Sequence, residues 1–386
     1  MEQGGRSGTR VSIGLGFCRR NDLERMASIL EKYTDYLPLT DTSDIHSIGE
    51  GNTPLVRSAG IVGNSQLFFK MEQLNPTGSF KDRFAALEIA LMKRQGIRAF
   101  IATSSGNTGA ALAAYAARHG IRCLLFVNEI TPASKLDQML VYGAEVFRVK
   151  DFGVTNELSA PIFERLQQVA IEGATRLVIS AYKYSPEGME GVKTIAYEIV
   201  EQFGGVPDHI FVPVGGGGLL SGIWRGFKDL KDLGLIESLP KVNAVQPELN
   251  DTVVTSINER SDTAREVGTT TTISGLAVQV DIDASLAVRS VSESGGRGFL
   301  VSDEMVIDTQ ASLAQKEGVY VEPAGAVSTA GYLKAVDTGD IGKDESAVCI
   351  LTGHGLKTAS SVAAKQEHSV KFIEIGEINT KLLAEQ

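Results

Sequence analysis

The stretch His209–Phe227, HIFVPVGGGGLLSGIWRGF, indicates the fold because it joins an apolar run, four glycines and a helical pattern. The run His209–Val214 is typical of a buried strand, and the pattern from Leu219 onward is typical of a helix. Between them, Gly215, Gly216, Gly217 and Gly218 expose consecutive backbone N–H groups at the start of a helix, where the helix dipole favours an anion. A tightly packed turn is the simpler explanation. Because four glycines carry a conformational-entropy cost, we favour a phosphate-binding loop.

The same order of strand, loop and helix recurs along the chain and predicts an α/β fold. Buried strands separated by helices indicate mainly parallel sheets covered on both faces, that is, three-layer domains. We expect a smaller N-terminal domain at residues 66–183 and a larger domain formed by residues 1–65 and 184–386. The predicted strands are Leu67–Met71, Ala99–Thr103, Arg122–Val127, Glu145–Val149, Leu177–Ser180, His209–Val214, Val242–Val245 and Val348–Leu351. The predicted helices are Lys81–Arg94, Ala110–Arg118, Ala133–Tyr142, Ala160–Ile171, Gly191–Phe203 and Leu219–Leu230.

Composition and charge exclude several classes of protein. The chain has 386 residues, 43% of them hydrophobic, with a net charge of −10. An acidic chain without basic clusters is a poor candidate for binding nucleic acid or anionic membranes. No apolar run reaches the length of a membrane span and no signal-peptide pattern is present, so we expect a cytoplasmic protein.

Cysteine and histidine spacing predicts neither disulfides nor a metal site. The three cysteines form no CxxC pair, and the five histidines match no metal-ligand spacing. Cys123 and Cys349 lie in apolar runs, where a small buried thiol is expected.

Two further junctions carry chemistry. Residues 104–109, SSGNTG, place hydroxyl and N–H groups at the start of a helix, which suits either a carboxylate ligand or an ordinary N-cap cluster. Residues 75–83, NPTGSFKDR, place Lys81 in the first turn of a helix, where a cation opposes the dipole. Lys81 is therefore either a solvated surface residue or an amine that reacts with a carbonyl group. Together with the glycine loop, these groups suit pyridoxal 5'-phosphate and an amino-acid substrate.

Four ordered motifs resemble one family over nearly the whole chain, from about Tyr36 to Lys357. NPTGSFKDR, SSGNTG, GGGGLLSG and EPAGA are similar to those of the fold type II pyridoxal-phosphate enzymes, also called the tryptophan synthase β family. Within that family, LPLTDTSDIHSIGEGNTPLV, EGVKTIAYEI and LTGHGLK resemble threonine synthases. The resemblance implies a lyase or synthase of amino-acid metabolism that acts as a homodimer.

The resemblance also implies roles for single residues. Lys81 forms the Schiff base with the cofactor and moves protons, Asn107 bonds the cofactor's 3-hydroxyl group, and Thr352 faces the pyridine nitrogen. The backbone of Gly215, Gly216, Gly217, Gly218 and Leu219 holds the phosphate. Ser104, Ser105 and Thr108 help to bind the substrate carboxylate.

The chain departs from the threonine synthase pattern where a second, substrate phosphate binds. Phe84 replaces a glycine, Leu87 stands where a second lysine is common, and Gly188 replaces an arginine. Each lost charge-assisted contact is worth about 1.5–3 kcal/mol. Lys183 and Arg297 are candidates to compensate.

Other features resemble serine and threonine dehydratases, namely GGGGLLSG and EPAGA. Some dehydratase relatives bind a cation through an acid that Gln246 replaces here, so no metal is expected. The sequence leaves three hypotheses open. The first is elimination or replacement at the β or γ carbon of a small hydroxy- or O-phospho-amino acid, and the second is a dehydratase that releases a 2-oxo acid and ammonia. The third is a catalytically silent cofactor-binding protein. Residues 250–300 are weakly periodic, and either a mobile or an oligomer-contacting section fits them.

Overall fold

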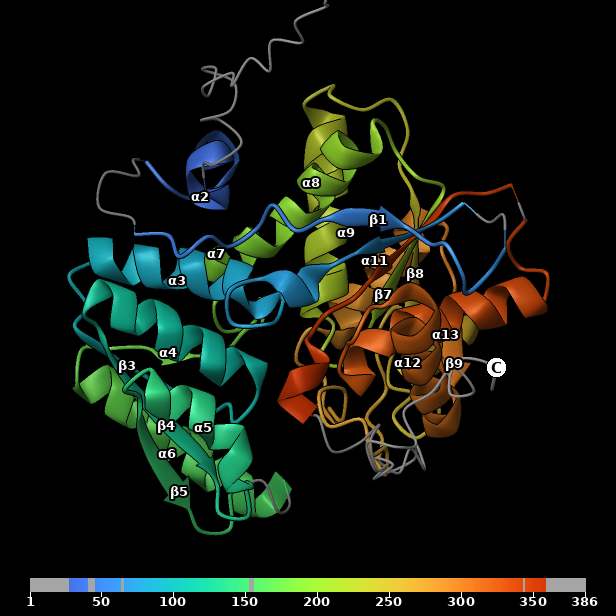
Figure 1. Cartoon of the computed structure of the whole chain (residues 1–386). Helices are drawn as coiled ribbons and strands as arrows, with labels where there is room; N and C mark the ends of the chain where they lie inside the picture. The colour runs from blue at the N-terminus through green and yellow to red at the C-terminus, as the bar shows by residue number, and fades with distance from the viewer. Residues whose placement is uncertain (1–27, 41–45, 64–65, 153–155, 343, 359–386) are drawn as a thin grey trace, which may run out of the picture.

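The computed structural model describes residues 28–40, 46–63, 66–152, 156–342 and 344–358, which form two sheets with helices packed around them (Figure 1). The larger sheet has six strands in the order β1-β2-β10-β7-β8-β9, all parallel except the edge strand β1. Its strands are β1 (Leu55–Arg57), β2 (Leu67–Lys70), β10 (Ala347–Ile350), β7 (His209–Pro213), β8 (Lys241–Pro247) and β9 (Gly298–Val301). The predicted α/β class with mainly parallel sheets is confirmed.

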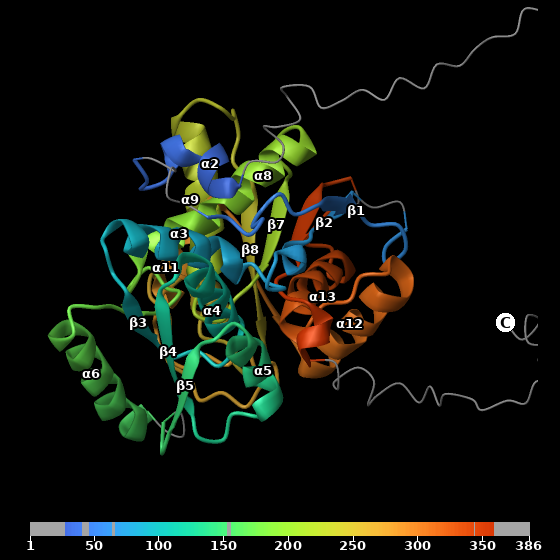
Figure 2. The same cartoon turned by 60° about the vertical axis from the view of Figure 1, so that its left-hand side comes forward.

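Helices cover both faces of the larger sheet (Figure 2). One face carries α12 (Asp303–Glu317) and α13 (Pro323–Asp337), and the other carries α8 (Thr194–Phe203), α9 (Gly218–Asp232) and α11 (Ala284–Ser294). Strand β7 shows why its sequence is continuously apolar. Phe211 belongs to the core under α13, whereas its neighbours Ile210 and Val212 belong to the opposite core. Side chains alternate along a strand, so a strand buried on both faces is apolar throughout.

The smaller sheet has four parallel strands in the order β5-β4-β3-β6. Its strands are β5 (Glu145–Val149), β4 (Arg122–Asn128), β3 (Ala99–Ala102) and β6 (Leu177–Val178). The helices around it are α3 (Lys81–Arg94), α4 (Asn107–His119), α5 (Ala133–Val141) and α6 (Asn156–Glu172). Helix α3 is buried on every side from Asp82 to Met92 because it packs against α4 on one side and α7 (Pro186–Met189) with its following turn on the other.

Two segments contribute strands to the larger sheet. The predicted division of the chain counts residues 67–71 with the smaller domain, yet β2 pairs with β10 inside the six-stranded sheet. Residues 250–300 contain α10 (Val254–Asn258), α11 and most of β9, and β9 pairs with β8 to form the far edge of that sheet.

Cys123 and Cys349 are buried, as predicted, while Cys18 lies outside the described residues. Among the helices that the structure describes, none is long and apolar enough to cross a membrane.

Candidate active site

The glycine loop forms a cradle for an anion. The chain turns at Gly217, whose φ is 96°, and a Cβ there would lie 2.4 Å from the carbonyl oxygen of Asp283, so no side chain fits. Helix α9 begins directly after it without a side-chain cap. Within the described parts of the chain, no acceptor takes the N–H groups of residues 215–219. Free N–H groups at the start of a 15-residue helix suit a phosphate group.

Lys81 lies beside this cradle. Its Nζ donates a hydrogen bond of 2.6 Å to Oγ of Ser180, two residues beyond β6, and lies 4.6 Å from the centre of the Phe80 ring. The carbonyl oxygen of Ser180 is 3.7 Å from the position of a Cβ on Gly218. Ser180 therefore contacts the Lys81 amine through its side chain and lies near the glycine cradle through its backbone.

The environment of Lys81 tunes its amine for chemistry near neutral pH. Burial lowers the pKa of Lys81 to about 8, because a desolvated ammonium is costly, and the Asp283 carboxylate opposes part of this change. Asp283 is held in place because its carboxylate accepts the N–H groups of Tyr182 and Lys183 at 2.7 and 3.1 Å. With a pKa of about 8, roughly one tenth of the Lys81 amine is neutral at pH 7 and about half at pH 8, and the neutral form is the one that a nucleophile or base requires.

Asn107 and Thr108 reach the same place from the start of α4. Oγ1 of Thr108 lies 3.0 Å from Oγ of Ser180. Nδ2 of Asn107 donates a hydrogen bond of 2.8 Å to Oε1 of Glu322, a buried residue just before α13. Burial raises the pKa of Glu322, while Lys357 and the Asn107 amide oppose this change. The Asn107 side chain is thus oriented by a carboxylate at the start of α13, a helix that packs on the larger sheet.

Thr352 follows β10 and borders the candidate active site from the larger sheet. Its carbonyl oxygen accepts the N–H of Phe80 at 3.0 Å, which ties the loop before α3 to the end of β10. A Cβ on the next residue, Gly353, would lie 2.1 Å from Oε1 of Glu322 and 3.1 Å from Nδ2 of Asn107. Thr352 therefore lies between the residue preceding Lys81 and the Asn107–Glu322 pair.

Ser104 and Ser105 line the loop that leads from β3 into α4. Both are half-buried, and Oγ of Ser104 accepts the N–H of Gly106 at 3.3 Å. The structure therefore brings every predicted site residue to the carboxyl ends of the two sheets, where ligands of open α/β sheets bind. This arrangement fits pyridoxal 5'-phosphate. It combines the free N–H groups of residues 215–219, the Lys81 amine with its lowered pKa and the Asn107 side chain that Glu322 orients.

A buried ion network anchors the helix that carries Lys81. The Arg83 guanidinium bonds both carboxylate oxygens of Glu72, each at 2.7 Å, and both of Glu198, at 2.8 and 2.9 Å. Nζ of Lys70 adds a bond of 2.6 Å to Glu198. These four side chains are at most 1% exposed. The first turn of α3 is thereby fixed to β2 and α8.

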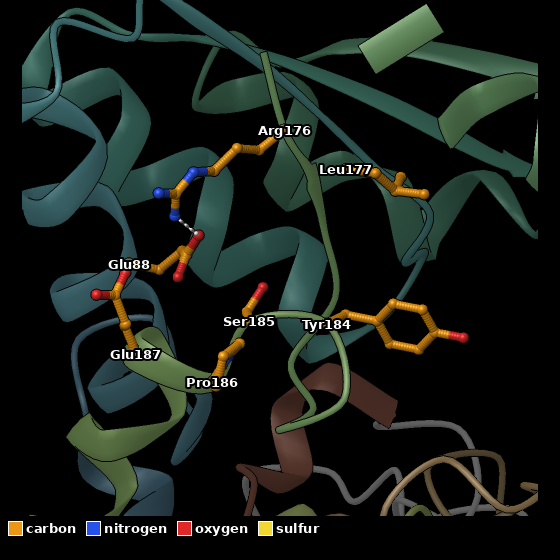
Figure 3. A pocket seen from close by; sticks show the side chains of 7 residues that line it. All are labelled: Glu88, Arg176, Leu177, Tyr184, Ser185, Pro186 and Glu187. Carbon is orange, nitrogen blue, oxygen red and sulfur yellow. Dashed lines mark hydrogen bonds and ion pairs between the residues drawn. The ribbon is translucent and has the colours of Figure 1, made fainter. Parts of the chain in front are cut away.

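The structure gives a physical reason for glycine at position 188. A Cβ at Gly188 would lie 2.3 Å from Oε2 of Glu88 and 3.0 Å from the Phe84 ring. Glu88 lines a pocket between α3 and α7 and pairs with Arg176 at 3.3 Å (Figure 3). Leu87 is fully buried. Phe84 and Glu88 therefore occupy the space that a side chain at position 188 would need, and Leu87 is a core residue.

The two candidates for compensating charge lie in different places. Arg297 precedes β9 at its amino end and pairs with Asp340, so it is remote from the carboxyl ends of the strands. Lys183 stays near the site because its N–H bonds Asp283. A cation that the sequence reasoning missed is Lys135 of α5, whose Nζ lies 3.4 Å from Oγ of Ser274, between α10 and α11, and which acts electrostatically on Glu322.

The Gln246 side chain holds the start of α10 through hydrogen bonds. Its Oε1 accepts the N–H groups of Val253 and Val254 at 2.8 and 2.9 Å, and its Nε2 donates to Thr252 at 3.0 Å. Within the described ranges there is no group of three His, Cys, Asp or Glu side chains that could hold a metal ion.

Comparison with known proteins decides the family. The protein-family model for pyridoxal-phosphate dependent enzymes matches residues 46–353 of this chain. The chain belongs to this family. It is 37% identical to the threonine synthase of Methanocaldococcus jannaschii over 88% of this chain and 84% of that protein. It is 35% identical to the threonine synthase of Halalkalibacterium halodurans, over 87% and 91% of the two chains. The serine racemase of Dictyostelium discoideum superposes with a TM-score of 0.65 at 27% identity and covers 79% of this chain and 92% of its own.

This pyridoxal-phosphate enzyme is threonine-synthase-like, so the resemblance, the cofactor and the class of lyase that the sequence predicts are confirmed. The roles of single site residues stay predictions. Sequence reasoning missed Ser180, Asp283 and Glu322. Glu322 stands in the quoted motif EPAGA and Ser180 ends a predicted strand, so each carried a signal of position, whereas Asp283 carried none.

Proposed function

We propose that this enzyme converts phosphohomoserine and water into threonine and phosphate. The observation that carries the proposal is the Lys81 amine beside the glycine cradle, joined to it through Ser180. Relatives named threonine synthase, 35–37% identical over most of the chain, support this substrate.

The residues have separate tasks. The N–H groups of residues 215–219, which no described acceptor takes, would hold the cofactor phosphate, and the Lys81 amine would bind the cofactor and take the α-proton of the substrate. Ser104, Ser105 and Thr108 would orient the substrate carboxylate at the start of α4, and the Thr352 hydroxyl would face the cofactor ring. Bound pyridoxal phosphate supplies a delocalised system for the charge left behind by the α-proton.

Lys135 is the cation that we assign to the substrate phosphate. It is an exposed residue on α5, and its Nζ lies near Ser274 and within electrostatic reach of Glu322. Replacing Lys135 by alanine should raise KM for phosphohomoserine about tenfold, since a charge-assisted contact is worth about 1.5–3 kcal/mol. The affinity for pyridoxal phosphate should not change. An unchanged KM would refute the assignment.

The function is tested by measuring phosphate, threonine, ammonia and 2-oxo acid from phosphohomoserine and, separately, from threonine and serine. Equal amounts of phosphate and threonine support the proposal. Ammonia with a 2-oxo acid from threonine or serine, without phosphate chemistry, would establish the dehydratase alternative instead.

The covalent role of Lys81 is tested independently of turnover. The loaded enzyme is reduced with borohydride, digested and mapped by mass spectrometry. A pyridoxyl label on Lys81 is expected, and its loss in Lys81→Ala is the control. Absence of the label would leave only the catalytically silent hypothesis.

We further propose a homodimer in the cytoplasm, as the family resemblance implies. Sedimentation equilibrium of the loaded enzyme should give twice the chain mass, and a monomer at micromolar concentration would refute the assembly.

A further inference from the structure

Ser180 stands between two reactive groups of the site. Its Oγ accepts the hydrogen bond from Nζ of Lys81 at 2.6 Å and lies 3.0 Å from Oγ1 of Thr108. The three side chains come from the start of α3, the segment just after β6 and the start of α4. No comparison assigns a role to Ser180. A line of three exchangeable groups is the arrangement through which a proton moves by short steps.

We propose that Ser180 is a proton-relay residue that connects Lys81 with Thr108. This inference rests on the proposed function, in which Lys81 takes the α-proton and an oxygen leaving group departs. The Lys81 ammonium gives one proton to Oγ of Ser180. The hydroxyl proton of Ser180 passes to Oγ1 of Thr108, and the hydroxyl proton of Thr108 passes to the departing oxygen. Both hydroxyl groups end neutral, and the net change is one proton moved from nitrogen to oxygen.

The surroundings favour this direction of transfer. The ring of Phe80 lies 4.6 Å from Nζ of Lys81 and shields it on one side, and Asp283 is the described charged group that acts on the amine. The Asp283 carboxylate is already occupied by the N–H groups of Tyr182 and Lys183. It stabilises the ammonium by its charge, and Ser180 remains the side chain to which Lys81 donates.

The first test needs neither substrate nor cofactor. The pKa of the Lys81 amine is measured in the cofactor-free protein from the pH dependence of its acetylation, read on the Lys81 peptide by mass spectrometry. Ser180→Ala removes the acceptor of the ammonium and should lower this pKa by about one unit. Thr108→Val keeps the contact between Lys81 and Ser180 and should leave the pKa in place. An unchanged pKa in Ser180→Ala would overturn the proposal.

The second test uses the loaded enzyme. Ser180→Ala and Thr108→Val should each lower kcat about 100-fold, the usual contribution of a positioned acid–base group. Because both interrupt one relay, the double variant should be no slower than the slower single variant. Effects that multiply, or a rise in KM of Thr108→Val without loss of kcat, would show that Thr108 serves only the carboxylate and would overturn the relay.

Two further variants keep the test specific. Ser180→Thr retains the hydroxyl group and should restore most of kcat, whereas Ser185→Ala removes a nearby buried hydroxyl that bonds neither Lys81 nor Thr108 and should change nothing. A failure of Ser180→Thr to exceed Ser180→Ala would count against the relay. If the wild-type enzyme released no phosphate, the proposed substrate would be wrong, and the pKa measurement would still judge the contact between Lys81 and Ser180.

Discussion

Replacing Arg83 by methionine tests how the helix that carries Lys81 is held in place. Arg83 bonds both oxygens of Glu72 and of Glu198, and with Lys70 these groups form a buried set of two cations and two anions. Removing the guanidinium leaves one uncompensated negative charge in the interior. Breaking a buried ion pair in this way costs about 3–5 kcal/mol. We expect a loss of that size in the free energy of unfolding.

The dependence of the free energy of unfolding on pH gives a second test of the buried ion network. Burial alone would raise the pKa of Glu198, but Arg83 and Lys70 outweigh it and lower the pKa to about 2, from an ordinary value of 4.5. A carboxylate whose pKa is lower in the folded state stabilises the fold above the unfolded value, and this stabilisation disappears as the pH falls from 4.5 towards 2. In Arg83→Met the free energy of unfolding should therefore fall less on acidification, because Arg83 is the main cause of the lowered pKa of Glu198.

The assay is urea unfolding followed by circular dichroism at pH 7 and at pH 4. Arg122→Ala is the matched control, because its pair with Glu145 is exposed and such pairs contribute about 0–1 kcal/mol. Adding Glu72→Gln to Arg83→Met restores neutrality and should recover about 1 kcal/mol or more. A loss in Arg83→Met no larger than that of Arg122→Ala, or no recovery in the double variant, would refute the reasoning.

Three further outcomes are expected. Gly217→Ala should weaken pyridoxal phosphate binding at least about tenfold in a spectroscopic titration, because φ is 96° and the added Cβ would clash with a carbonyl oxygen. The control is Gly234→Ala, where φ is 69° and the space around the Cβ is open. This variant should leave the affinity unchanged and cost about 1 kcal/mol of stability. Gly188→Ala should lower the free energy of unfolding by about 1–3 kcal/mol, since its Cβ would meet a buried carboxylate oxygen at 2.3 Å; unchanged stability in urea would contradict this packing. Thiol reagents at pH 8 should label neither Cys123 nor Cys349 in the native enzyme, because burial raises the pKa of both thiols, that of Cys123 to about 12; peptide mapping after labelling checks this.

Local patterns predicted the elements that carry the site. The helix Lys81–Arg94 has the predicted bounds, and the strand and helix around the four glycines differ from prediction by one or two residues. These segments are bounded by glycines and buried on several sides, so hydrophobicity and turn residues mark their ends. The short strands Leu55–Arg57 and Gly298–Val301 escaped prediction, because three or four residues at a sheet edge carry little periodic signal.

Sheet membership could not be predicted in the same way. Strand Leu67–Lys70 pairs with Ala347–Ile350 from the other end of the chain. The alternation of side chains along a strand fixes which face is buried, but a strand's own sequence does not encode its partner.

By itself, the sequence determined the class of fold and the cofactor, and it predicted the residues that would hold the cofactor, since these depend on motifs contained within a few consecutive residues. Only the tertiary structure decided which distant side chains meet. Ser180 lies against Lys81, and Glu322 orients Asn107 from 215 positions away. The physical reason is that these contacts cross from one packed sheet to another or join separate elements of one domain. A single polar side chain carries no sign of its partner until the two sheets are packed together.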